Sequence, residues 1–296
     1  MPAAITHYLH AKRILEAVRK GEPSFHVDGD AFFWGAQGPD FLFCSRFLPW
    51  QRGESLSVYG SRLHDLTPSV LFSAIKKYEA SHPGEPLRSY ILGFLCHYSA
   101  DRVCHPFVCF GARTLLEEDP SQSEEVFHNQ IESALDTIML RYETAQLPLE
   151  FPLKRAVPKN ESAVKAAAGL YVYLLAELFQ KKVSFEQMLE AFRDCRTIFG
   201  LLTDRTGFKK NLVEKLEGGK KRSISCHIRP LSEKEETDYA NILNGEWRWP
   251  PESETYRDES FFALYEKAVK DGAELLKEWP NSADMEAFTE EIPFGG

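Results

Sequence analysis

Apolar residues recur at intervals of three and four along much of this chain, the period of an amphipathic α-helix. Residues 5 to 19 show this spacing, and Gly21 follows as a stop signal. The same pattern, read with its capping residues, predicts further helices over 68–78, 87–105, 121–145, 161–181, 184–198 and 258–279. Alternating patterns typical of strands are nearly absent, so we predict an all-α fold, a multi-helix bundle.

Residues 22 to 66 have a different character. Glycine, proline and aromatic residues are dense there, and no helical period is sustained. The segment is too apolar to remain solvated, so we interpret it as a long functional loop region. Asp40 and His64 are its conspicuous polar members.

The segment from Tyr90 to Phe110 is mostly apolar but carries His97, Asp101 and His105 at steps of four. On a helix these side chains stack along one face, with a drift of roughly 40° per step. Burying an ionised carboxylate without a partner costs several kcal/mol, whereas a metal ion turns the same groups into ligands. Because Pro106 disfavours a helical conformation at the residue before it, we expect His105 to end the helix and to point differently from His97.

A second histidine and carboxylate, His128 and Glu132, lie one helical turn apart. The preceding Asp119-Pro120, together with Ser121 and Glu124 at capping-box spacing, marks the start of their helix. The two helices are therefore expected to face one metal cluster.

The candidate ligands are the polar residues that the sequence places in apolar or loop settings. They are five histidines and three carboxylates: His7, Asp40, His64, His97, Asp101, His105, His128 and Glu132. Imidazole with carboxylate suits zinc, iron or manganese better than calcium or magnesium. Eight ligands exceed the needs of one tetrahedral zinc, so the set predicts a cluster.

Composition limits the class of protein. The chain has 296 residues and a net charge of −9, which argues against broad attraction to nucleic acid or to an anionic membrane surface. The N-terminal residues lack the pattern of a signal peptide, and no apolar run approaches the ~18 residues of a membrane span. We therefore expect a cytoplasmic protein without a transmembrane segment. The six cysteines have no zinc-finger or redox spacing and are interpreted as buried thiols.

Prolines at 148, 152 and 158 mark a candidate linker, which divides the chain into a core of residues 1–145 and a helical extension of residues 146–296. Within the extension, residues 205 to 222 hold seven Lys or Arg against two acids. We interpret this segment as a solvated surface, with contact to a substrate phosphate as the alternative. Residues 247 to 251 form an aromatic loop.

The candidate ligands and their flanking sequences together resemble the motifs of a known family. The chain resembles the zinc-dependent phospholipase C family, which is related to zinc-dependent single-strand nucleases. The matching elements are THYLHAKRIL with His7, the Pro-Asp of Asp40, the loop His64, HYSAD with His97 and Asp101, His105-Pro106, and FHNQIESALDTI with His128 and Glu132. They lie between residue 5 and about residue 140.

The resemblance implies a site for two or three zinc ions. Asp40, His64, His97 and Asp101 would hold one zinc, His105, His128 and Glu132 a second, and His7 with a shared Asp101 a third. It also implies that Asp40 is the general base of phosphodiester hydrolysis.

Two details depart from the secreted members of that family. Those relatives bind the third metal through an N-terminal tryptophan, which this chain lacks; the amine of Pro2, freed by removal of Met1, is our hypothetical substitute. The residues that recognise a choline head group have no clear counterparts here, apart from Phe41. The predicted substrate is a small or lipid phosphodiester, with phospholipid preferred, and no stable nucleic-acid complex or specific protein partner is expected.

Other interpretations stay open. His64-Asp65 is the dipeptide of HD-type metal phosphohydrolases, although that reading leaves His128 and Glu132 unused. A nuclease, or a non-catalytic helical protein stabilised by metal, is also compatible with the pattern. The remaining histidines are interpreted as surface or core residues without a metal role: His10, His26, His82 and His227.

Overall fold

The computed structural model describes residues 4–218, 222–231 and 237–296. Within these ranges the chain forms helices and no β-strand, and its one extended pairing is an isolated antiparallel bridge between Trp247 and Arg257. The predicted all-α fold is confirmed. The α-helices are α1 (Ala4–Gly21), α2 (Gly29–Gly35), α3 (Ser57–His64), α4 (Pro68–Ser81), α5 (Glu85–Glu118), α6 (Glu124–Thr144), α7 (Glu161–Phe179), α8 (Phe185–Leu202), α9 (Lys209–Leu216), α10 (Phe261–Glu278) and α11 (Met285–Thr289). Short 3-10 helices join them: η1 (Gly38–Cys44), η2 (Pro148–Glu150), η3 (Leu153–Arg155), η4 (Ser225–His227) and η5 (Trp279–Asn281).

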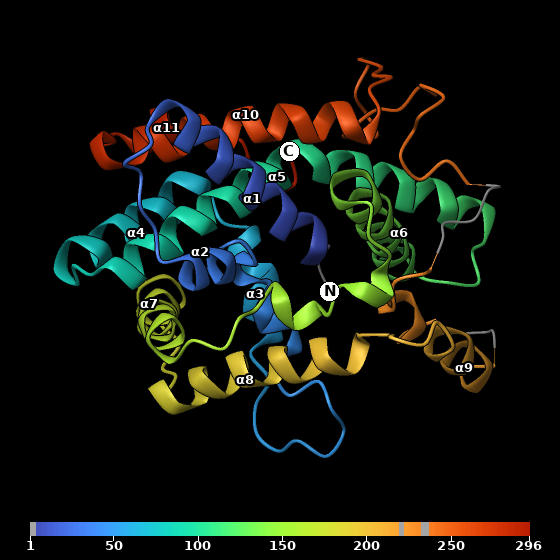
Figure 1. Ribbon diagram of the computed structural model, residues 1–296, viewed down its shortest axis with the longest axis horizontal. Coiled ribbons are helices and arrows are strands. Elements are labelled where there is room, and N and C mark those ends of the chain that lie inside the picture. Colours follow the sequence, from blue (N-terminus) through green and yellow to red (C-terminus); the bar gives the residue numbers. More distant parts are fainter. Residues whose placement is uncertain (1–3, 219–221, 232–236) are drawn as a thin grey trace.

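Helix α5 is the centre of the fold. Helices α1, α2, α6, α7 and α10 all pack against it. In Figure 1, α10 and α11 run along the top of the molecule, α8 runs along the bottom, and α5 passes between them. The helix therefore carries its polar residues into the interior of the molecule.

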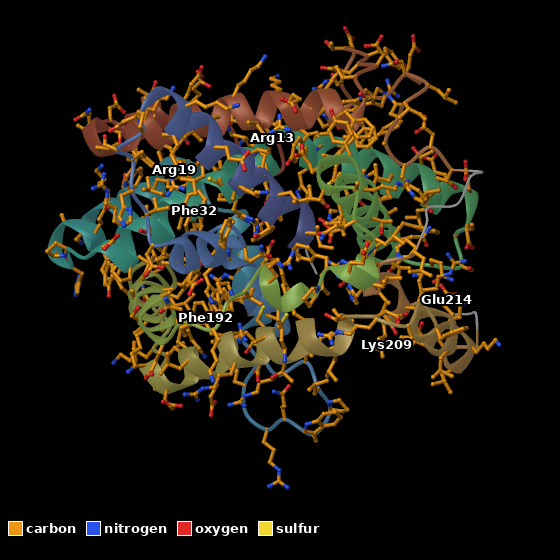
Figure 2. All side chains as sticks on the ribbon, in the orientation of Figure 1. Arg13, Arg19, Phe32, Phe192, Lys209 and Glu214 are labelled. Carbon is orange, nitrogen blue, oxygen red and sulfur yellow. The ribbon has the colours of Figure 1, made fainter. Side chains whose placement is uncertain are left out.

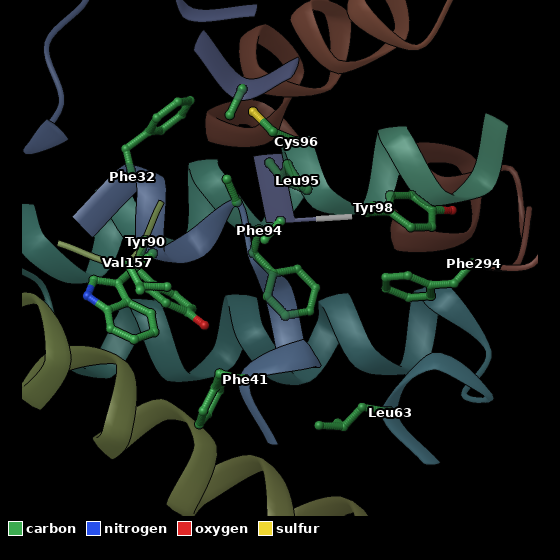
Figure 3. Close-up of a cluster of buried hydrophobic side chains, with 14 of the residues drawn as sticks. Phe32, Phe41, Leu63, Tyr90, Phe94, Leu95, Cys96, Tyr98, Val157 and Phe294 are labelled. Carbon is green, nitrogen blue, oxygen red and sulfur yellow. The ribbon is translucent and has the colours of Figure 1, made fainter. Parts of the chain in front are cut away.

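The buried apolar side chains form one core that joins distant parts of the sequence. Figure 3 shows Phe94 and Tyr98 of α5 together with Phe41 of η1, Leu63 of α3 and Phe294 near the C-terminus. The proline-rich segment expected to be a linker also enters this core, through residues such as Phe151, Leu153 and Val157. A domain boundary at residue 145 stays a prediction, and the residues beyond it share the core with those before it.

A close contact between two glycines holds α2 against α5. A Cβ on Gly35 would lie 2.0 Å from the carbonyl oxygen of Tyr90, and one on Gly93 would lie 2.0 Å from that of Phe32. Only glycine allows the two backbones to approach this closely. The contact fixes the position of the chain that follows α2, which is the segment that carries Asp40.

Most predicted helices appear, as α1, α4, α7, α8 and α10. The prediction that Pro106 ends its helix is wrong, because α5 continues through it to Glu118. Proline inside a helix removes one hydrogen bond and costs about 3 kcal/mol. Burial of Phe107, Val108 and Ala112 beyond the proline offsets this cost.

Two further expectations also need correction. The cap of α6 is Ser123, whose side chain accepts a hydrogen bond from the backbone N–H of Val126, and not Ser121. Ser121 instead donates to the side chain of Asp119 in the turn before the helix. The region 22–66 is not one long loop, because the short helices α2, η1 and α3 occupy much of it.

Helix α7 is long and apolar enough to cross a membrane by length and composition, a test that the core helix of a globular protein also passes. In this fold it packs against α8, α5, α4 and α2. The absence of a transmembrane segment stays a prediction.

Candidate metal centre

The predicted ligands converge on one open cavity of about 650 Å³. Helix α1, η1, α3, α5, α6 and η4 contribute its walls. Seven of the eight predicted ligands line it: His7, Asp40, His64, Asp101, His105, His128 and Glu132. The eighth, His97, is fully buried. The structure therefore brings together residues as far apart in the sequence as His7 and Glu132.

Four of these side chains form a first group around the middle of α5. His97 Nε2 lies 3.2 Å from Asp101 Oδ2, one helical turn further along the helix. His64 Nε2, at the end of α3, lies 3.2 Å from Asp40 Oδ1 and 3.5 Å from Asp101 Oδ2. The two imidazole Nε2 atoms of His64 and His97 are 3.2 Å apart.

His7 reaches the same group from α1. Its Nε2 lies 3.4 Å from Asp101 Oδ1, the other oxygen of the shared carboxylate. Its ring stands 4.6 Å from the ring of His97, centroid to centroid. Asp101 thus has one oxygen facing His7 and the other facing His64 and His97, so its two oxygens could serve different metal ligand sets.

A second group forms further along α5. His105 Nε2 and His128 Nε2 are 3.2 Å apart, and His128 Nε2 lies 3.2 Å from Glu132 Oε1. His105 is two helical turns beyond His97, which displaces it about 12 Å along the helix axis and turns it roughly 80° around it. The expected difference in direction between the two histidines is thus present, although it arises from helical rotation and not from a helix end at Pro106.

The donor atoms are arranged to hold cations. Three sets of ligand atoms lie within 4.8 Å of one another: His7, His97 and Asp101; Asp40, His64 and His97; and His105, His128 and Glu132. Nδ1 of His64 lies 2.8 Å from the carbonyl oxygen of Gly60. A proton on that nitrogen would leave the lone pair of Nε2 facing two carboxylates and a second imidazole, a contact that a metal ion relieves. This fit supports zinc as the resident metal, since imidazole and carboxylate are zinc ligands.

The electrostatics of the second group show the same need for positive charge. Burial alone would lower the pKa of His128, but the carboxylate of Glu132 and the neighbouring Cys109 raise it to about 10. Burial alone would raise the pKa of Glu132, but His128 lowers it to about 2. The two side chains therefore favour an extra positive charge between them, which a proton or a metal ion supplies.

The pKa of His97 is shifted in the opposite direction from that of His128. Burial is the largest influence on this imidazole and lowers its pKa to about 4, even with Asp101 and Asp40 nearby. A neutral imidazole is the form that binds metal. Gly38 packs directly against this ring; its φ is +51°, and a Cβ there would lie 2.1 Å from His97 Cδ2. The glycine thus allows η1 to bring Asp40 beside His97.

The cavity also contains residues that the sequence did not single out as functional. His227 enters from η4, in the extension, and was expected to have no site role. Glu125 and Asn129 come from α6. Glu125 lies about one helical turn before His128, and Asn129 directly follows His128. The periodicity of α6 could have identified them, but nothing near His227 in the sequence signals its position. The proposed ligand Pro2 lies outside the described residues.

Comparisons with known proteins give one result. A family model described as zinc dependent phospholipase C matches residues 6–190. The matched range contains all eight predicted ligands and extends past about residue 140, where the resemblance read from the sequence ends, and past the predicted domain boundary at residue 145. No curated protein and no solved structure matches the chain.

Proposed function

Because the chain belongs to the zinc dependent phospholipase C family, we propose that it hydrolyses a phosphodiester and that this phosphodiester is carried by a phospholipid. The observation that supports this proposal most directly is the convergence of His7, Asp101 and Glu132, with the other ligands, on one open cavity. A buried structural network would have no need to face a solvent-accessible space of this size.

Zinc bound to these groups would lower the pKa of a water molecule and neutralise charge on phosphoryl oxygens. The chain itself supplies a base. Asp40 is buried, lines the cavity and has one carboxylate oxygen 3.2 Å from His64 Nε2. We propose that Asp40 acts as the general base and accepts the proton that water releases when its oxygen bonds to phosphorus.

The atoms balance as a hydrolysis. The water oxygen forms a new bond to phosphorus, and the bond from phosphorus to the glycerol oxygen breaks. Asp40 accepts one water proton and passes it to the leaving glycerol oxygen, and the second water proton stays on the phosphate product. For a phospholipid the products are a diacylglycerol and a phosphorylated head group.

The wall of the cavity favours a lipid over a nucleic acid. Phe43, Phe47 and Val58 line it beside the polar groups, so one side of the site is apolar. A nucleic acid would instead require cationic contacts to its backbone, and the net charge of the chain is −9. The apolar side suits the glycerol and the first part of the acyl chains.

The test combines metal content with substrate choice. We would measure zinc per chain by elemental analysis in the wild type, in Asp101→Ala and in the exposed control Asp258→Ala. Two or three zinc ions in the wild type, with at least one lost in Asp101→Ala and none in the control, are expected. Hydrolysis of phosphatidylcholine vesicles, of bis(p-nitrophenyl) phosphate and of single-stranded DNA would then be compared.

The outcomes separate the candidate functions. Release of phosphorylated head group that stops on chelation would support the proposal. Faster cleavage of DNA than of lipid would replace it with a nuclease. Full zinc occupancy without hydrolysis of any phosphodiester would leave a metal-stabilised binding protein.

A further inference from the structure

Helix α9 presents an apolar stripe to solvent. Phe208, at its N-cap, and Leu212 and Leu216 follow one another at steps of four, so they share one face. Their exposed fractions are 76%, 59% and 78%. Within the described ranges, no residue of α9 is buried. The stripe is therefore not packed on the core, and exposed apolar side chains on one face typically mark an interaction surface.

A second exposed apolar group lies on the loop between η1 and α3, residues 45–56, and on the first turn of α3. Trp50 is 71% exposed, and Phe47 and Val58, which line the cavity, are 43% and 55% exposed. An exposure this high is unusual for tryptophan, which has the largest side chain. Phe47 and Val58 therefore place apolar surface at the cavity, and Trp50 lies three residues after Phe47 in the same loop.

The two groups flank the same element. The ring of Phe47 lies 6.4 Å from that of His227 in η4, centroid to centroid, and α9 packs against η4. Lys210 of α9 donates a hydrogen bond of 2.7 Å to the carbonyl oxygen of Ser225, the first residue of η4. In Figure 1 the loop and α9 both project along the lower side of the molecule, where Figure 2 labels Lys209 and Glu214 on α9. Phe47 and Val58 line the cavity, and α9 packs on η4, whose His227 also lines it.

Positive charge accompanies this surface although the chain as a whole is acidic. Among the described residues of this segment, 205–218 and 222, there are five Lys or Arg and two acids, against a net charge of −9 for the chain. Both acids are engaged locally. Glu214 lies 3.5 Å from Lys210, and Glu217 accepts hydrogen bonds from the backbone N–H groups of Ile224 and Ser225. Three of the described cations are engaged as well, because Lys209 and Lys210 donate to backbone carbonyl oxygens and Arg222 donates to Gln130. The exposed cations are Arg205 and Lys215.

We propose that α9, the 45–56 loop and Val58 at the start of α3 form a docking face for a bilayer that contains anionic phospholipid. An exposed apolar stripe with basic neighbours is the pattern of a helix that lies in the membrane interface, and tryptophan favours the same depth. A protein partner would have no need for the excess of lysine and arginine, whereas anionic lipid head groups complement it. Docking in this orientation turns the mouth of the cavity toward the lipid surface. The inference rests on the proposed function only in its choice of a lipid, and it can be tested without turnover.

The test measures binding of the full chain to vesicles by co-sedimentation, in buffer without added zinc and without a substrate analogue. Vesicles of phosphatidylcholine with 30% phosphatidylserine are compared with pure phosphatidylcholine. The variant L212E/L216E adds two acids to the stripe. The control I242E/L243E makes the same change at two other exposed apolar residues, which are 65% and 83% exposed. Both pairs are solvent-exposed, so neither substitution removes core packing.

We expect the wild type and the control to bind the anionic vesicles, and L212E/L216E to bind them at least tenfold more weakly. The fluorescence of the wild type should shift to shorter wavelength on binding, and this shift should decrease in Trp50→Phe. Hydrolysis of bis(p-nitrophenyl) phosphate should be unchanged in L212E/L216E, because neither residue lines the cavity.

Equal binding by the wild type and L212E/L216E, or an equal loss in the control, would overturn the docking face. So would a wild-type dimer in sedimentation analysis that only L212E/L216E dissociates, because the stripe would then be an interface between two copies. Vesicle binding without hydrolysis of any phosphodiester would contradict the proposed function and leave the docking face standing. Hydrolysis of soluble phosphodiesters without vesicle binding would overturn the docking face and leave the phosphodiesterase activity standing.

Discussion

The backbone of Gly38 lies against the imidazole of His97 so closely that no side chain fits between them. A Cβ at position 38 would be 2.1 Å from His97 Cδ2, and the φ of Gly38 is +51°. This contact joins η1, which carries Asp40, to the buried face of α5. The position of one predicted ligand therefore depends on the absence of a side chain at a neighbouring residue.

Gly38→Ala should displace His97 and weaken the first group of ligands. We expect a loss of about 1 to 3 kcal/mol in the free energy of unfolding, from backbone strain and overpacking, with less zinc bound per chain. The measurements are thermal unfolding and elemental analysis. Gly21→Ala is the matched control, because a Cβ there meets nothing within 4 Å. Full zinc binding in Gly38→Ala would show that η1 can move without disturbing the ligands.

His128 and Asp65 separate two interpretations of the site. Both residues line the cavity, but only His128 lies beside His105 and Glu132. If the second group holds a metal, His128→Ala should lose about one zinc per chain, while Asp65→Ala keeps all of its zinc. An HD-type site would give the reverse result, because the His64-Asp65 dipeptide would then provide the ligands. Elemental analysis of the two variants, side by side, decides between them.

Asp136 ties the first turn of α1 to α6. Its carboxylate is fully buried and accepts hydrogen bonds from the backbone N–H groups of Ile5 and Thr6, and it pairs with Arg229 at 2.7 Å. This arrangement fixes the start of the helix that carries His7.

Removing that carboxylate takes away the buried acceptor of the α1 backbone N–H groups and the ion pair with Arg229. We therefore expect Asp136→Ala to lower the free energy of unfolding by roughly 3 to 5 kcal/mol, as measured in urea. Zinc held by His7 should also bind more weakly. Glu16→Gln is the control; it removes only an exposed ion pair with Lys12, so its effect should be below about 1 kcal/mol. A change in Asp136→Ala no larger than in this control would contradict the anchoring role.

His10 makes the fold sensitive to acid. Its side chain is fully buried, and burial lowers its pKa to about 3. In the unfolded chain the pKa returns to about 6.5, so the unfolded state takes up the proton first as the pH falls. The stability contributed by neutral His10 is thus complete above pH 6.5 and is lost progressively between pH 6.5 and pH 3.

Between pH 7 and pH 5 this linkage should cost about 2 kcal/mol. We would measure urea unfolding at both pH values for the wild type and for His10→Leu, each with zinc removed. The variant should lose less stability than the wild type over this interval. An equal loss in both proteins would show that other groups cause the acid sensitivity. Zinc removal keeps metal release from contributing to the comparison.

The sequence by itself determined the class of the fold and the identity of the candidate ligands. Helical periodicity predicts α1, α4, α7, α8 and α10, because each buries one face along a regular step. The steps of four from His97 to Asp101 and from His128 to Glu132 place each pair on one helical face without knowledge of the tertiary structure. The family, too, was recognisable from these local motifs.

The tertiary structure alone decided how those motifs meet. Local preference predicted a helix end before Pro106, but packing on both sides of the proline continues α5 to Glu118. The place of His227 in the cavity and the exposure of Leu212 and Leu216 depend on contacts between segments far apart in the sequence. Periodicity identifies which face of a helix is apolar, but only packing decides whether that face is covered.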